Sequence, residues 1–136
     1  MAGPDAAMMA GPAAIARFIE TGVAAAVADA FAKSDVAIFE NFAPHLFVGP
    51  GAVNRWIAAM GEHLASSREL KHRFGVARDF AVSGDLAYFS LPTHWRGLAG
   101  GRPFRERGGW AFVLVWADAK WRVRNYAWAV TDLKVG

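Results

Sequence analysis

A single carboxylate, Glu40, stands where the pattern of its segment calls for an apolar residue. The segment VAIFENFAPHLF covers residues 36–47. In a strand, alternate side chains share a face, so Glu40 would point where Val36 and Ile38 point. Burying a carboxylate costs several kcal/mol unless it is paired, protonated or beside a cavity. Two alternatives follow: Glu40 faces a cavity as an acid or base, or a one-residue shift buries Phe39 and exposes Glu40.

Two of the four histidines are candidates for a proton-transfer partner of Glu40. His72 alternates with Phe74 and is therefore predicted to point inward, either as a core histidine or as a catalytic one. His94 follows Pro92, which cannot donate to a sheet ladder and indicates an edge or a bulge. Either histidine could form an acid–base dyad with Glu40. The other two histidines are expected at the surface: His45 and His63.

Aromatic residues are numerous enough to line a pocket as well as to fill a core. The chain has six Trp and ten Phe among 136 residues, and aromatic-rich small domains have either bulky cores or lined pockets. Arg124 shares the parity of the last-strand aromatics and could meet an anionic group, unless a bulge puts Asn125 in its place. The candidate ligand-binding residues are Trp56, Phe74, Trp110, Arg124, Tyr126 and Trp128.

Composition favours a folded protein without a metal or a cofactor. The chain is 54% hydrophobic and 20% charged, a balance that supports one domain with a single core. It has no cysteine, which excludes disulfides, thiol catalysis and thiolate metal sites. No histidine or carboxylate spacing matches a metal site, and the glycine-rich segments do not open a helix as a phosphate loop does.

Charge and hydropathy indicate which partners and which location to expect. The net charge is +3, too small a bias to indicate nucleic acid. Between Leu86 and Ala117, Glu106 is the only acid against four arginines, which an anionic ligand could use; ordinary solvated strand faces are the favoured explanation. No signal peptide or membrane span is recognisable. We therefore expect a cytoplasmic protein that does not bind membranes, with residues 1–11 as a flexible tail.

Hydrophobic periodicity places helices first and strands after them. Apolar residues at helical spacing predict two short helices, or one kinked helix, over 13–33, and a clear further helix from Val53 to Leu64. Alternation predicts a short hairpin over 36–48 and long strands from residue 72 onward. The expected fold class is α+β, with three N-terminal helices packed in the concave face of a curved, mixed, mainly antiparallel sheet, and residues 12–136 as one domain.

Short signatures in this order resemble a known family. They are a hairpin ending in F-x-G-P, the helix GAVNRWIAAM, the turn SGDLAYF and a last strand that opens with KWRV. Together they resemble the nuclear transport factor 2-like superfamily, in its ketosteroid isomerase and SnoaL-like polyketide cyclase branch, over residues 13–132. The resemblance implies a cystatin-like cone that opens at one end into an apolar pocket. It also implies a carboxylate base at Glu40 and a pocket aromatic at Trp128.

The sequence departs from the isomerases at the groups that stabilise negative charge. Their first helix carries a tyrosine where this chain has Ile15 and Phe18, and their late-strand acid falls near Gly108, with Glu106 as the nearest carboxyl. Without such donors, enolisation loses its largest catalytic contribution. The resemblance therefore implies a pocket protein for a hydrophobic small molecule: either an isomerase, dehydratase or cyclase using acid–base chemistry without a cofactor, or a non-catalytic ligand-binding or dimerisation domain. Nucleic-acid binding through the arginine-bearing strands ranks third.

The late strands are apolar on both faces. Trp110 and Phe112 share one face, and Ala111, Val113 and Val115 make the other face apolar too. A sheet that is apolar on both faces must be covered on both, and the helices cover one. A second copy related by a two-fold axis is the simplest cover for the other, so we predict a homodimer.

Overall fold

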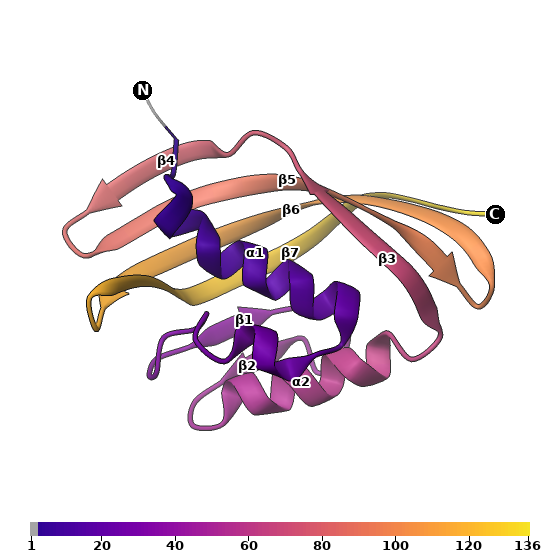
Figure 1. The fold of residues 1–136 in the computed structure, drawn as a ribbon, viewed down its shortest axis with the longest axis horizontal. Helices are drawn as coiled ribbons and strands as arrows, with labels where there is room; N and C mark the ends of the chain where they lie inside the picture. The colour runs from indigo at the N-terminus through magenta and orange to yellow at the C-terminus, as the bar shows by residue number, and fades with distance from the viewer. Residues whose placement is uncertain (1–2) are drawn as a thin grey trace.

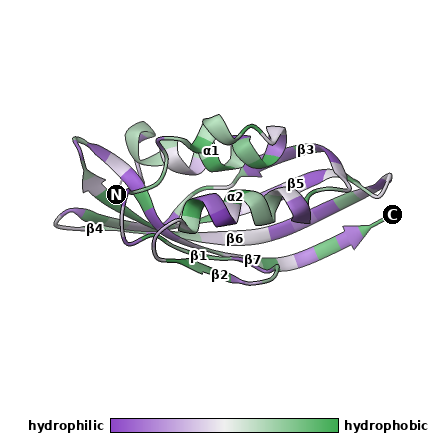
Figure 2. Cartoon of the chain, turned by 90° about the horizontal axis from the view of Figure 1, so that it is seen from below, coloured by the Kyte–Doolittle hydropathy of each residue, from purple (hydrophilic) through white to green (hydrophobic). Residues whose placement is uncertain are grey.

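Two helices lie on one face of a curved seven-stranded sheet in the computed structural model, which describes residues 3–136 (Figures 1 and 2). The elements are α1 (Ala6–Thr21), the 3₁₀ turn η1 (Ala24–Val27), β1 (Ala37–Phe39), β2 (Leu46–Val48), α2 (Ala52–His63), β3 (Ser67–Phe74), β4 (Arg78–Ser83), β5 (Leu86–Ala99), β6 (Arg102–Ala117) and β7 (Lys120–Val135). Neither helix is long and apolar enough to cross a membrane.

The sheet is mixed and mainly antiparallel, as predicted. Its strand order is β2-β1-β7-β6-β5-β3, with β4 beside β5. Only the β1–β7 pairing among the described strands is parallel. β3 and β4 pair with opposite ends of β5, so the first strand expected from residue 72 onward is interrupted after Phe74, and Val76 in the link is exposed. Figure 1 shows α1 lying across this sheet, with α2 beside the β1–β2 hairpin.

Helix α1 begins earlier than the sequence indicated. The side chain of Asp5 accepts a hydrogen bond of 2.9 Å from the backbone N–H of Met8, and thereby caps the helix. Gly22 ends it in the left-handed conformation. The prediction of a flexible tail is therefore wrong for residues 6–11, because they form the first turns of α1 and bury Met8 against the core. Residues 1–2 of the predicted tail lie outside the described residues.

The predicted second N-terminal helix does not form. After the four residues of η1, the backbone of Ala30 accepts from Val123 and that of Ala32 donates to Val123, both at 2.8 Å. These bonds join the segment to β7 as a parallel bridge. Three predicted helices are thus two α-helices and one 3₁₀ turn, because sheet pairing with a distant strand outweighs the local preference for helix in this alanine-rich stretch.

Helix α2 carries the side chain that organises the core next to Glu40. Trp56 is fully buried on its apolar face. The rings of Phe18 from α1, Phe31 from the bridge and Tyr126 from β7 lie 5.2, 5.4 and 6.0 Å from the Trp56 ring. Edge-on and tilted contacts of this kind add to the free energy gained by burial. The cluster fixes α2 over the start of the β1–β7 pairing.

Candidate functional site

Glu40 lies inside the molecule, at the end of β1. Its backbone N–H donates to His45 across the hairpin at 2.9 Å. Ile38, two residues earlier, pairs with Tyr126 of β7 and is fully buried. Glu40 follows the same parity and is 7% exposed, whereas Phe39 is 50% exposed. Of the two alternatives that the sequence left open, the inward one is correct.

Two buried donors hold one oxygen of the Glu40 carboxyl. Trp56 Nε1–H donates to Oε2 at 2.9 Å, and the Tyr126 hydroxyl donates a short hydrogen bond to the same atom. Among residues 3–136, no hydrogen bond reaches Oε1. Because Glu40 lines a cavity, Oε1 is the oxygen left for a molecule that enters it.

Burial sets the proton affinity of this carboxyl. Desolvation raises the pKa of Glu40 from 4.5 to about 7, against the opposing effect of the Tyr126 and Trp56 hydrogen bonds, and the charge of Glu106 adds to the rise. The buried hydroxyl of Tyr126 has a pKa well above its usual value, first through burial and then through the charge of Glu40. Tyr126 therefore stays protonated and acts as a donor.

A cavity of about 300 Å³ opens beside Glu40, between the helices and the inner face of the sheet. Most of its wall is apolar: Met60, Leu70, Trp95, Phe104, Trp110 and Trp128. Trp110 is nearly fully buried, and its Nε1 is the only fully buried side-chain nitrogen or oxygen in residues 3–136 without a hydrogen-bond partner. A ligand could accept from this N–H only after the Trp110 ring or its neighbours move, because the nitrogen itself is closed off from the cavity.

Two further titratable side chains line the same cavity. Glu106 of β6 has its pKa raised by burial. His63, in the last turn of α2, has its pKa lowered by burial, and its ring stacks on Phe42 at 4.3 Å. No lysine or arginine is among the lining residues. The cavity thus combines apolar walls with proton-carrying groups and disfavours anions.

Comparison with solved structures finds the same architecture in proteins of low sequence identity. The hexachlorocyclohexane dehydrochlorinase LinA-type3 from Novosphingobium barchaimii aligns over 96% of this chain and 88% of its own, with a TM-score of 0.81 and 11% identity. A nuclear transport factor 2-like superfamily protein from Salmonella enterica aligns over 93% and 89%, with a TM-score of 0.73 and 14% identity. A ketosteroid isomerase candidate from Shewanella frigidimarina aligns over 92% and 96%, with a TM-score of 0.71 and 19% identity.

The chain has the nuclear transport factor 2-like fold. This confirms the resemblance seen in the sequence at the level of the fold. No protein-family model matches the chain, and no curated protein matches it in sequence.

Within the nuclear transport factor 2-like fold, the two histidines named as partners of Glu40 lie elsewhere. His72 Nδ1 is 2.7 Å from Glu20 Oε2, and the same oxygen accepts from the His72 backbone at 2.8 Å. His94 lies on the opposite face of β5 from the buried Trp95, between Arg73 and Arg107 of the neighbouring strands. Neither dyad forms, because His72 has an acid on α1 as its partner and the pleat turns His94 outward.

The predicted ligand-binding residues divide into three groups. Trp110 and Trp128 line the cavity. Trp56 and Tyr126 lie behind Glu40 and orient it, without lining the cavity themselves. The other two predicted residues lie outside the cavity. Phe74 packs against Trp110. Arg124 is the extra residue of a bulge in β7, opposite the bond between Val113 and Leu114 of β6.

Sequence reasoning missed His63 and Glu106, although each carried a signal. His63 follows Trp56 and Met60 at helical spacing, which places the three on one face of α2. Glu106 has the same strand parity as the inward Trp110. In residues 3–136 no group of three or more histidine or acidic side chains could hold a metal ion.

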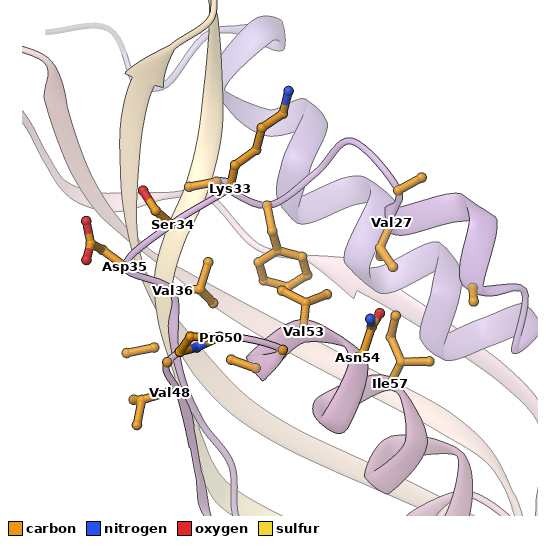
Figure 3. A pocket seen from close by; sticks show the side chains of 18 of the residues that line it. Val27, Lys33, Ser34, Asp35, Val36, Val48, Pro50, Val53, Asn54 and Ile57 are labelled. Carbon is orange, nitrogen blue, oxygen red and sulfur yellow. The ribbon is translucent and has the colours of Figure 1, made fainter.

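A second groove, of about 1010 Å³, lies between η1, the end of the hairpin and the start of α2 (Figure 3). Figure 3 shows Val36, Val53 and Ile57 facing it, with Lys33 and Asp35 at its edge. Lys33 pairs with Asp118 at 3.8 Å, and both side chains are exposed. The groove holds no buried acid or base, so it lacks the chemistry present around Glu40.

Proposed function

We propose that the chain is a small-molecule enzyme in which Glu40 transfers a proton within an apolar cavity, without a cofactor. The observation that carries the proposal is a carboxyl with a pKa of about 7, buried beside a cavity of about 300 Å³. A general base works best when its pKa lies near the working pH. The reaction class is isomerisation, dehydration or cyclisation of a hydrophobic molecule.

The hydrogen bonds around Glu40 suit this role. Trp56 and Tyr126 fix Oε2, so the carboxyl group has one orientation and Oε1 remains for the substrate. Oε1 would take a proton from a carbon of the substrate and return it to another atom, or the substrate would lose a leaving group instead. Negative charge that develops on the substrate needs a donor, and the unpartnered Nε1–H of Trp110 could serve only if a shift of its ring opened it to the cavity.

The lining indicates a neutral substrate. Two carboxyl groups, Glu40 and Glu106, face a cavity that no cationic side chain lines. An anionic ligand would be repelled by either carboxylate in a desolvated space, where such repulsion is strong. The aromatic wall favours a flat or cyclic apolar molecule. The names of two similar structures, a dehydrochlorinase and a ketosteroid isomerase candidate, are in keeping with this class.

The test is proton exchange at carbon. A panel of neutral cyclic ketones is incubated with the protein in deuterium oxide, and NMR follows deuterium uptake next to the carbonyl. We expect uptake with the native chain and loss of at least a hundredfold in Glu40→Gln, which keeps the shape but cannot carry the proton. Glu62→Gln, the same change at an exposed position of α2, is the matched control and should exchange normally. Equal exchange with Glu40→Gln would contradict the proposal.

A non-catalytic binding domain is the second candidate. One observation favours it. Trp56 and Tyr126 both donate their hydrogen bonds to the Glu40 carboxyl, so neither is free to stabilise negative charge on a substrate. Saturable quenching of tryptophan fluorescence by the same ketones, without deuterium uptake in any variant, would establish binding alone. Saturable binding together with uptake that depends on Glu40 would establish catalysis.

A further inference from the structure

Four cationic side chains stand in one row across the outer face of the sheet. The register pairs Lys71 of β3 with Arg96 of β5, Arg96 with Arg105 of β6, and Arg105 with Lys134 of β7. All four are exposed. Adjacent strands lie about 4.8 Å apart, so the row spans about 14 Å. We call these four residues the cationic row.

The cationic row is not neutralised within the chain. None of the four ion pairs found in residues 3–136 includes one of its members, and none of its side chains donates a hydrogen bond there. Like charges directly opposite each other destabilise a sheet. Four cations in succession therefore lower the stability of the free protein, and an anionic ligand would relieve their repulsion.

The surface around the cationic row is hollowed. A depression of about 620 Å³ is lined by all four cations together with Glu69, Leu98 and Pro103. The neighbouring row, two residues further along the strands, holds Arg73, His94, Arg107 and Asp132. Figure 2 shows hydrophilic colouring gathered at this end of the long strands, near the C-terminus. Arg73 and Arg107 therefore extend the positive charge beyond the hollow, and Asp132 is the one acid in that row.

We propose that the cationic row binds a small molecule that carries two or more phosphate groups. Arginine forks match phosphate oxygens with two hydrogen bonds each, and lysines add point charges. The size of the hollow suits a small ligand better than a polymer. Phe104 is the one ring in its lining, and it is half-buried, so no exposed ring is present there to stack nucleic-acid bases. The site lies on the opposite face of the sheet from Glu40 and is independent of the function proposed there.

Calorimetric titration with inorganic tripolyphosphate at low salt tests the proposal. We expect saturable binding of one tripolyphosphate per chain, with an affinity that falls as salt is added. Arg96→Gln and Arg105→Gln should each weaken binding by about tenfold, as expected for the loss of one charged hydrogen-bonded contact. Arg96→Lys, which keeps the charge but loses the two-pronged contact, should weaken binding less than Arg96→Gln does. Bound tripolyphosphate should also raise the melting temperature of the native chain.

The control is Arg17→Gln, an equal change of net charge at an exposed position of α1. It should leave the affinity for tripolyphosphate unchanged, and circular dichroism should show every variant folded. Absence of binding at millimolar tripolyphosphate, or equal weakening by Arg17→Gln, would overturn the proposal. So would a single-stranded oligonucleotide that binds much more tightly than tripolyphosphate and displaces it, because the partner would then be a nucleic acid.

Discussion

At the scale of single residues, the candidate site depends on how one carboxyl group is buried. Glu40 is desolvated, which raises its pKa, while two donors from other elements lower it again. The two donors fix Oε2, and burial keeps the proton affinity near neutrality. The same two donors therefore fix the geometry of the carboxyl and oppose the rise in its pKa that burial causes.

Replacing Glu40 with Gln should change how stability depends on pH. The pKa of Glu40 is about 7 in the folded chain, against its ordinary value of 4.5, so the folded chain binds the proton more tightly. The native chain should lose stability as pH rises from about 4.5 to 7, by about 3 kcal/mol at about 1.4 kcal/mol per pH unit. Glu40→Gln should lack this loss. Urea denaturation at several pH values measures it, and parallel curves for both proteins would contradict a raised pKa.

Removing the tyrosine donor should raise the pKa of Glu40 further. In Tyr126→Phe the carboxylate loses a hydrogen bond that favours its charged form, so the pKa should move above 7. Carbon-13 NMR of the Glu40 carboxyl measures the change. Tyr88→Phe, at the other tyrosine, which is exposed, should leave the pKa as it is. An unchanged value in Tyr126→Phe would show that the hydroxyl does not act on Glu40.

At the scale of elements, α1 can cover the sheet closely because it has no side chain at Gly11. A Cβ there would lie 2.8 Å from Val123 Cγ2 and 3.4 Å from the carbonyl oxygen of Ala30. The same region of β7 also pairs with the segment after η1. One glycine therefore permits the contact of helix, bridge and strand that closes the core beside Trp56.

Two glycine-to-alanine changes should have opposite effects on stability. Gly11→Ala should destabilise the fold by about 1–3 kcal/mol, since overpacking outweighs the gain in helix propensity. Gly61→Ala, in α2 with nothing within 4 Å of the added carbon, should stabilise it by about 0.5–1 kcal/mol. Thermal denaturation of both variants makes the comparison. Stabilisation by both would mean that α1 does not pack closely on β7.

At the scale of the whole molecule, the outer face of the sheet has two parts. One end carries the cationic row and the charged row beside it, and an apolar part lies around Val113 and Phe39, the latter 50% exposed. Leu46 and Val48 of β2 extend the apolar part and are also exposed. The helices cover only the inner face (Figure 2). A second copy remains the simplest cover for the apolar part.

The chain should therefore form a dimer of twice 14.7 kDa. Light scattering at about 10 μM measures the mass, a concentration well above the Kd expected for an apolar interface of standard size. Val113→Lys, in the middle of the apolar face, should give a folded monomer. Val76→Lys, in the exposed link between β3 and β4, should remain dimeric. A native chain with the mass of a monomer would contradict the prediction.

The sequence by itself determined what depends on local periodicity. Alternation of apolar and polar residues predicted the late strands of a curved, mainly antiparallel sheet, because successive side chains of a strand point to opposite faces. The same parity placed Glu40 beside Ile38 and made the inward orientation one of two alternatives, and the helical spacing around Trp56 predicted α2.

Tertiary structure decided everything that depends on distant partners. Residues 30–32 join β7 instead of a helix, because their bonds go to Val123. His72 is paired with Glu20 of α1, 52 residues away, so it is not free for Glu40. The pKa of Glu40 depends on Tyr126, which lies 86 residues along the chain. Local periodicity does not predict such contacts. They form only when the sheet folds around the helices and removes water from the space between them.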